Sequence, residues 1–185
     1  MNASRIPDFV LVTGNPGKLR ETERLLGRSV ESVEVDLPEI QSLDLTEVLT
    51  AKAAEAARHT DRPFVVEETG LELATLNGFP GPLVKWMLAA VGPEGIARVA
   101  LATGNPGVTA RCALLFQDGE RQVVAEGTTA GSLVLPARGE HGFGWDPVFL
   151  PDGSERTYGE LSDSDKDRFS HRGGAWRALA AALGA

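Results

Sequence analysis

The chain has 185 residues, of which 42% are hydrophobic and 24% charged, and its formal net charge is −8. These values are typical of a soluble globular protein, and we expect one domain over residues 1–185 with a substantial core. The acidic balance argues against a protein that binds nucleic acid or an anionic membrane surface. The single cysteine, Cys112, excludes an intramolecular disulfide, and three scattered histidines do not favour a zinc site.

The sequence does not predict a membrane segment. No apolar run approaches the roughly 18 residues that a helix needs to cross a bilayer. No signal peptide precedes Phe9. We therefore expect a cytoplasmic protein.

The first predicted elements frame a Gly-rich turn. An apolar strand over residues 8–13 leads through the turn into an amphipathic helix over residues 17–26. This layout brings backbone N–H groups, a helix N-terminus and a lysine ammonium to one point, where phosphate is the usual anion. An ordinary turn is the competing interpretation. The candidate phosphate-binding residues are Thr13, Gly14, Asn15, Pro16, Gly17 and Lys18.

Two well-known phosphate motifs are absent from this turn. Gly14 and Gly17 are too close together for a Walker A loop, and the G-x-G-x-x-G fingerprint of dinucleotide-binding proteins is missing. The same pentapeptide, TGNPG, recurs at residues 103–107, where Val108 stands in place of the lysine. We interpret the second copy as an ordinary turn.

The middle of the chain alternates further strand and helix patterns. Asp44-x-x-Glu47 is a capping pattern and predicts the start of a helix. A proline such as Pro82 suits the first turn of a helix. The expected elements are a strand within residues 29–35, a helix over about 44–58, a short buried strand at 64–66, and helices that begin near Pro82 and Glu94.

The last third of the chain changes character. Residues 109–116 and 122–129 flank Asp118-Gly119, which predicts a β-hairpin. A short acidic helix is expected from about Ser162, and an Ala/Leu-rich helix from about Ser170. The whole order of elements predicts a mixed α/β fold with an antiparallel section.

Acidic residues interrupt two apolar patterns. Glu67 and Glu68 follow the predicted strand at 64–66, and strand alternation would send their side chains to opposite faces. Glu39 lies beside Pro38 in a predicted loop. Carboxylates of this kind suit Mg²⁺, which binds one or two of them together with substrate phosphates. Solvated acids at strand ends are the competing interpretation.

An aromatic loop and a cationic helix start form two further candidate sites. In GFGWDP, rings between glycines with an adjacent acid offer a stacking surface and a hydrogen-bond acceptor for a flat heterocycle, or simply a tight turn with core aromatics. Lys166 and the Ser170-His171-Arg172 segment suit an anion or a carbonyl oxygen. A helix cap at Ser170 with solvated neighbours is the plainer alternative.

Taken together, these segments resemble the Ham1/inosine triphosphate pyrophosphatase family. The resemblance spans roughly residues 10–183 and rests on six motifs in order, TGNPGK, DLPEIQ, VEETG, GFPGPLVKW, GFGWDPVFLPDG and SHR. It implies Mg²⁺-dependent hydrolysis of non-standard purine nucleoside triphosphates (ITP, dITP and XTP) to the monophosphate and pyrophosphate. It also implies an elongated mixed β-sheet flanked by helices, two lobes with a central active-site cleft, and a homodimer.

The resemblance also implies roles for individual residues. The turn from Thr13 to Lys18 would hold the triphosphate, and Glu39 and Glu68 would bind the metal ion. Glu68 would also act as the base, with Thr69 beside it. The residues that would contact the substrate include Lys52, Lys85, Lys166, Phe143, Gly144, Trp145, Asp146, His171 and Arg172.

This sequence departs from the family pattern at Glu68, where the family has Asp. The extra methylene changes the reach of the carboxylate by about 1.5 Å, and an error near 1 Å can reduce a rate about a hundredfold. Glu67 is therefore the second candidate base. A nucleotide-binding protein that has lost turnover through this substitution is the alternative function, and a broader pyrophosphatase is another.

Overall fold

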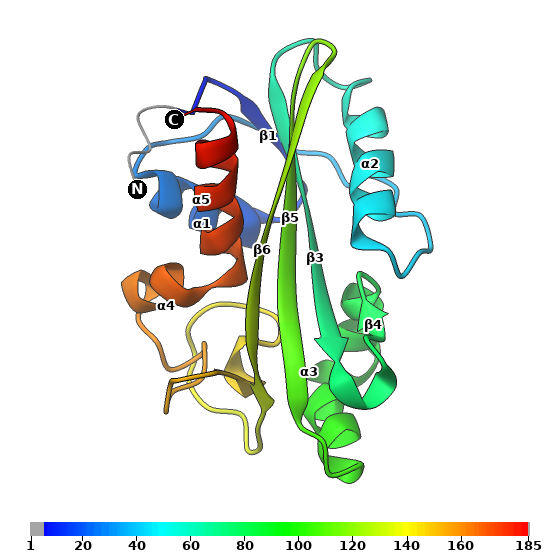
Figure 1. The fold of residues 1–185 in the computed structure, drawn as a ribbon, viewed down its shortest axis with the longest axis vertical. Coiled ribbons are helices and arrows are strands. Elements are labelled where there is room, and N and C mark those ends of the chain that lie inside the picture. The colour runs from blue at the N-terminus through cyan, green and yellow to red at the C-terminus, as the bar shows by residue number, and fades with distance from the viewer. Residues whose placement is uncertain (1–5, 185) are drawn as a thin grey trace.

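Within residues 6–184, which the computed structural model describes, seven strands form one mixed sheet that runs through the length of the molecule (Figure 1). The strand order is β2-β1-β3-β5-β6-β7, and β4 pairs with β3. β1 is parallel to β2 and β3, whereas the pairs β3–β4, β3–β5, β5–β6 and β6–β7 are antiparallel. The strands are β1 Val10–Val12, β2 Ser32–Val33, β3 Phe64–Leu73, β4 Pro80–Gly81, β5 Gly107–Asp118, β6 Arg121–Leu133 and β7 Phe149–Pro151.

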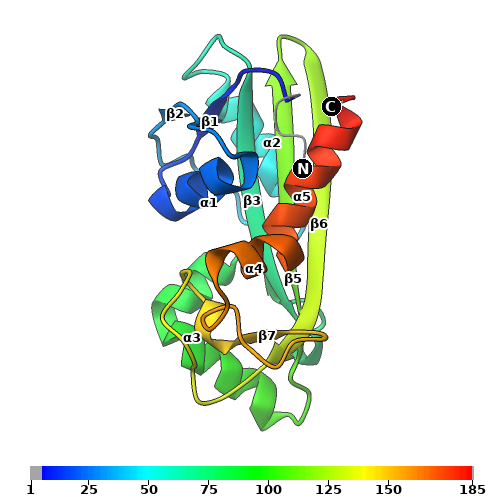
Figure 2. The same cartoon turned by 90° about the vertical axis from the view of Figure 1, so that its left-hand side faces the viewer.

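Helices cover both faces of this sheet (Figures 1 and 2). In one lobe, α1 and α5 pack on one face around Trp176, and α2 packs on the other face around Leu49. In the other lobe, α3 packs with β7 and the chain after it around Phe149 and Tyr158. The helices are α1 Pro16–Leu26, α2 Leu45–Ala56, α3 Val84–Ala102, α4 Asp163–Phe169 and α5 His171–Ala182. The expected two-lobed α/β fold with a mixed sheet is confirmed, and no helix of residues 6–184 is long and apolar enough to cross a membrane.

The two lobes separate along the edge of β3 that lies between its pairing with β1 and its pairing with β4. β1 pairs with β3 only as far as Val65, and β4 pairs with it only from Leu71. In the residues that the structure describes, no strand covers this edge between those two points. β5 pairs with the opposite edge along the whole strand, so β3 remains straight while one side of it stays open for side chains.

The predicted cap at Asp44 is confirmed, Ser170 is the cap that the alternative interpretation gave, and the cap at Ser162 was not predicted. Asp44 caps α2 by accepting hydrogen bonds from the N–H groups of Thr46 and Glu47. Ser162 caps α4 and Ser170 caps α5 in the same way. The hairpin β5–β6 is also confirmed, and it is longer than predicted because β5 and β6 pair over their full length.

Two predicted strands need correction. The strand at 64–66 continues to Leu73, because β5 supplies a backbone partner for every residue including Glu67 and Glu68. The strand within 29–35 is reduced to Ser32–Val33. The two helices predicted near Pro82 and Glu94 are confirmed as the two parts of α3, which begins at Val84 and is broken at Gly92, whose φ of 68° and ψ of 175° are not helical.

The second TGNPG copy forms the turn between α3 and β5, as predicted. Asn105 accepts a hydrogen bond from the N–H of Gly107 at 3.2 Å, and Asn15 accepts one from Gly17 at 2.8 Å in the first copy. The two copies share this hydrogen bond but differ in backbone at the first glycine, since Gly104 has a φ of 74° and Gly14 has no positive φ, and one copy leads into a strand and the other into a helix.

Helix α5 lies so close to β6 that only a glycine fits between them. A Cβ added at Gly127 would collide with the backbone of His171, Gly174 and Ala175. We expect Gly127→Ala to lower the free energy of unfolding by about 1–3 kcal/mol, the range for overpacked cores, and to lower activity because α5 begins with His171 and Arg172. Urea denaturation measures the first effect.

The control is Thr128→Ala, an exposed neighbour on the same strand, which should leave stability within about 0.5 kcal/mol of the parent. Equal stability of Gly127→Ala and the parent protein would contradict this packing.

Candidate active site

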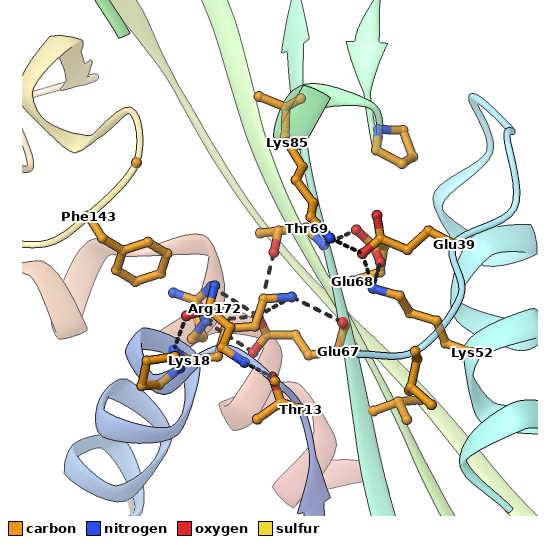
Figure 3. A pocket seen from close by; sticks show the side chains of 18 of the residues that line it. Thr13, Lys18, Glu39, Lys52, Glu67, Glu68, Thr69, Lys85, Phe143 and Arg172 are labelled. Atoms are coloured by element: carbon orange, nitrogen blue, oxygen red, sulfur yellow. Dashed lines mark hydrogen bonds and ion pairs between the residues drawn. The ribbon is translucent and has the colours of Figure 1, made fainter. Parts of the chain in front are cut away.

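A cavity of about 610 Å³ lies between the two lobes, beside the open edge of β3. Figure 3 shows its side chains, which converge from β3, α2, α3, the turn before α1 and the aromatic loop. Every predicted site residue except Gly17 lines this cavity. These residues are Thr13, Gly14, Asn15, Pro16, Lys18, Glu39, Lys52, Glu67, Glu68, Thr69, Lys85, Phe143, Gly144, Trp145, Asp146, Lys166, His171 and Arg172.

The main contribution of the turn between β1 and α1 to the cavity is the side chain of Lys18 rather than unpaired backbone N–H groups. The Asn15 side chain caps α1 and accepts hydrogen bonds from the N–H groups of Gly17 and Lys18, so the expectation that these two groups are free is wrong. The Lys18 ammonium donates to the backbone oxygen of Glu67 at 3.2 Å, on the open edge of β3. It also lies 3.5 Å from a carboxylate oxygen of Glu67.

Gly17 acts at the contact between the two lobes. A Cβ at this position would lie 3.1 Å from the ring of Phe143. The glycine therefore lets the aromatic loop pack against the first turn of α1.

Glu39 and Glu68 converge on a single ammonium group. Lys52 Nζ, from α2, lies 2.8 Å from Glu39 Oε1 and 2.5 Å from Glu68 Oε2 (Figure 3). Lys85 Nζ lies 3.6 Å from the same Glu39 oxygen. Burial alone would raise the pKa of Glu39, but Lys52, Lys85 and Lys18 outweigh it and hold that pKa below its usual value.

Glu67 points to the opposite side of β3, as strand alternation predicts, and is held by Arg172. Nε of Arg172 donates to both carboxylate oxygens at 3.0 and 3.1 Å, and Nη2 donates to Oε1 at 2.9 Å. Burial would raise the pKa of Glu67, but Arg172 and Lys18 outweigh it and lower that pKa. Glu67 is therefore an ionised anchor for two cations.

Glu21, in α1, is a site residue that the sequence analysis missed. Its carboxylate accepts a hydrogen bond from Lys166 Nζ at 2.6 Å and another from Arg172 Nη1. Lys166 also donates to Asp146 Oδ2 at 2.7 Å. Glu21 was missed because a Glu three residues before an Arg on a helix has the pattern of a surface ion pair. The one sequence signal for its role was its position one turn after Gly17, on the buried face of the helix.

The aromatic loop is both a tight turn and part of the cavity wall. Asp146 Oδ2 accepts a hydrogen bond from the Phe143 N–H at 2.7 Å, and Gly142 is required because a Cβ there would collide with that same carboxylate. Burial raises the pKa of Asp146. The Phe143 ring lies 5.3 Å from Lys166 Nζ and 5.4 Å from the Arg172 guanidinium, within the range of cation–π attraction.

His171 is buried and neutral. Burial of the ring, together with the charges of Arg172 and Lys166, lowers its pKa well below the usual range. Neither ring nitrogen has a hydrogen-bond partner among residues 6–184. A neutral imidazole has one donor and one acceptor nitrogen, so His171 can donate one hydrogen bond to a ligand.

Positive and negative groups balance around the cavity. Five cations and five carboxylates line it, and each cation is within 4.0 Å of at least one carboxylate. The five cations alone therefore do not make the cavity positive, because five carboxylates offset them. The cations are Lys18, Lys52, Lys85, Lys166 and Arg172, and the carboxylates are Asp36, Glu39, Glu67, Glu68 and Asp146.

The donor set fits a hard divalent cation that shares its coordination with a ligand. The described residues contain no cluster of three or more His, Cys, Asp and Glu side chains that could hold a metal ion alone. Glu39 and Glu68 nevertheless bring two carboxylate oxygens to one point. Mg²⁺ commonly uses one or two carboxylates with substrate phosphates and water.

Acid should weaken the buried ion pairs. The pKa values of Glu21 and Glu67 are lowered, so these carboxylates stabilise the fold above the unfolded pKa near 4.5, and this contribution is lost as pH falls below it. Asp146 acts in the opposite direction because its pKa is raised. We expect the urea concentration at half-unfolding to decrease when the pH is lowered from 5.5 to 3.5, and to decrease less in Glu21→Gln. Equal pH dependence of the two proteins would contradict the assignment.

The fold and the cavity define a class, the two-lobed α/β proteins with an inter-lobe cleft lined by both cationic and acidic side chains. Within this class, the chain belongs to the Ham1 family, whose sequence model matches residues 9–182. It is 40% identical over 168 residues to an inosine triphosphate pyrophosphatase of Yarrowia lipolytica, with 88% of each chain covered.

Solved structures agree with this assignment. A HAM1 protein from Coxiella burnetii superposes with a TM-score of 0.78 at 25% identity, covering 95% of this chain and 98% of the other. A nucleoside-triphosphatase, dITP/XTP pyrophosphatase, from Mycobacterium abscessus gives a TM-score of 0.67 at 31% identity, covering 92% and 98%. The Ham1 protein of Staphylococcus aureus gives 0.72 at 24% identity, covering 95% and 98%, and supports the fold. The family expected from the sequence is confirmed.

Proposed function

We propose that this protein hydrolyses ITP, dITP and XTP to the nucleoside monophosphate and pyrophosphate, and thereby removes these nucleotides from the cellular pool. One observation carries the proposal: a single cleft joins a cluster of lysines and carboxylates to an aromatic loop with hydrogen-bond donors. The relatives named for ITP and for dITP/XTP pyrophosphatase activity support the substrate class.

The triphosphate would lie along the open edge of β3. The turn that carries Lys18 reaches this edge from one lobe, Lys52 from α2, and Lys85 from α3 (Figure 3). Their charges would neutralise the phosphate oxygens, which carry most of the charge that develops during phosphoryl transfer.

Glu39 and Glu68 would hold Mg²⁺. When bound, this ion supplies Lewis-acid stabilisation of the phosphate oxygens and of the pyrophosphate leaving group. The geometry favours Glu68 over Glu67 as the group that orients or deprotonates the attacking water at the α-phosphorus. Glu67 is engaged by Arg172 and Lys18, whereas Lys52 is the one ion-pair partner of Glu68 among residues 6–184.

The purine would lie at the aromatic loop. Phe143 and Trp145 line this end of the cleft and can stack against a base. Arg172 has five N–H donors and uses three for Glu67 and Glu21, so two could face a ligand. A 6-oxo group accepts from Arg172 and His171, whereas the 6-amino group of adenine is a donor, and such mispairing can discriminate by about 10⁴-fold.

We also propose that the protein acts in the cytoplasm as a homodimer, as its family resemblance implies. Several large hydrophobic side chains remain exposed, which supports an interface between two copies of the chain; they include Ile40, Leu43, Phe79 and Trp86. Light scattering after gel filtration measures the mass, and a monomer at all concentrations would contradict the dimer.

Product analysis tests the reaction. With ITP and Mg²⁺ we expect equal amounts of IMP and pyrophosphate, and we expect EDTA to stop the reaction. Formation of IDP and phosphate would overturn attack at the α-phosphorus. Tight binding of ITP without any product would support the alternative, a nucleotide-binding protein that lost turnover when Glu replaced Asp at position 68.

A further inference from the structure

Lys52 occupies an unusual place for a lysine in this cleft. Its side chain is only 9% exposed, and its ammonium lies 2.8 Å from Glu39 and 2.5 Å from Glu68. Both carboxylates are themselves largely buried, at 18% and 6% exposure. The ammonium therefore holds together the two oxygen groups that a divalent cation would need.

A metal ion and this ammonium cannot share the position. The ammonium offsets one of the two negative charges of these carboxylates, and a divalent cation placed beside it would be repelled by it at close range in a weakly screened site. A metal ion can therefore bind between Glu39 and Glu68 only after the Lys52 ammonium has moved to another partner.

The triphosphate is such a partner, because it offers acceptor oxygens with high negative charge. We propose that Lys52 takes the place of the divalent cation between Glu39 and Glu68 in the nucleotide-free protein, so that the metal site forms only when a triphosphate draws the Lys52 ammonium onto its own oxygens. This inference rests on the proposed function, since it uses the same site and the same class of substrate.

The arrangement couples the two ligands. A nucleotide that removes Lys52 from the carboxylates raises the affinity for metal, and metal bound to the carboxylates releases Lys52 for phosphate and raises the affinity for nucleotide by the same factor. The balanced charges of the nucleotide-free cleft agree with this coupling. Removal of the Lys52 ammonium should therefore open the metal site without nucleotide.

Lys85 provides a matched control for this prediction. It also approaches Glu39, at 3.6 Å, but its side chain is 54% exposed and it contacts no oxygen of Glu68 within 4.0 Å among the described residues. Lys85 adds positive charge nearby without occupying the position between the two carboxylates. A general effect of positive charge would appear in variants of both lysines, whereas an effect of occupying the metal position would appear only in variants of Lys52.

The test is the affinity of the nucleotide-free protein for Mn²⁺, measured by the loss of the free-ion electron paramagnetic resonance signal. We expect Lys52→Met to bind Mn²⁺ at least about tenfold more tightly than the parent protein, and Lys85→Met to differ less than threefold from it. The added substitution Glu39→Gln should abolish the gain in Lys52→Met. Equal Mn²⁺ affinity of Lys52→Met and the parent, or an equal gain in Lys85→Met, would overturn the inference.

A second measurement keeps the inference testable if Lys52→Met folds poorly. Lys52→Gln retains a polar side chain and should show the same direction of change. The effect of a bound nucleotide is measured with an ITP analogue that has a methylene bridge between the α- and β-phosphates. The increase in Mn²⁺ affinity that this analogue causes should be at least about tenfold larger in the parent protein than in the Lys52 variant. Equal coupling in both would overturn the inference. Failure of the proposed function would appear separately, as absence of ITP hydrolysis by the parent, because Mn²⁺ binding without nucleotide does not depend on turnover.

Discussion

Glu68→Gln should lower the turnover of ITP by about 10²–10⁴-fold, the contribution typical of a general base, while the protein still binds the nucleotide. The glutamine keeps the size of the side chain but removes both the base and the charge that faces Lys52 at 2.5 Å. Steady-state release of pyrophosphate gives kcat, and nucleotide-dependent thermal stabilisation reports binding. Retention of more than about a tenth of the turnover would exclude Glu68 as the base.

The matching experiment at this position is Glu68→Asp, which installs the residue of the family pattern. Because Lys52 and Glu39 already converge on the longer Glu68 side chain, we expect the parent protein to be active and the aspartate variant to change kcat less than tenfold. A rise of a hundredfold or more would instead show that the glutamate had inactivated the parent. That result would support the nucleotide-binding alternative.

Arg172→Ala should destabilise the protein by about 3–5 kcal/mol, the cost of removing one partner from buried ion pairs. The substitution leaves the carboxylates of Glu67 and Glu21 buried without their guanidinium partner. Urea denaturation at pH 7 measures the loss. The double variant Arg172→Ala with Glu67→Gln should recover part of the stability, because it removes one of the uncompensated charges.

Arg168→Ala is the control, since Arg168 is exposed on the neighbouring α4 and makes no ion pair among the described residues. Its stability should lie within about 0.5 kcal/mol of the parent. Arg172→Ala should also reduce the preference for ITP over ATP in kcat/KM. A stable Arg172→Ala protein with an unchanged preference would contradict both roles of this residue.

The sequence predicted which segments meet at the cavity wherever a segment was recognisable by its residue types, and the roles of these residues stay predictions. The turn at Thr13–Lys18, the acids Glu39 and Glu68, and the aromatic loop all meet at one cavity, as the family resemblance implied. The caps at Asp44 and Ser170 were predictable because a short polar side chain before an apolar helical pattern has a local physical role.

The parts that the sequence did not predict depend on long-range pairing. The continuation of β3 through Glu67 and Glu68 could not be read from an acidic pair, because β5 supplies the backbone partners from more than forty residues away. Glu21 has the local pattern of a surface residue, and only the fold brings Lys166 and Arg172 to it. The pairing of Lys52 with both Glu39 and Glu68 likewise appears only when α2, β3 and a loop come together.

The most direct test of the whole account is the kcat/KM of the parent protein for ITP, dITP, XTP, ATP and GTP, measured by pyrophosphate release with Mg²⁺. The geometry of the cleft predicts rapid release from the first three and, for ATP, a value lower by as much as about 10⁴-fold. Equal values for ITP and ATP would contradict the role of Arg172 and His171 in selecting the base, and no release from any of the five would contradict the proposed hydrolysis itself.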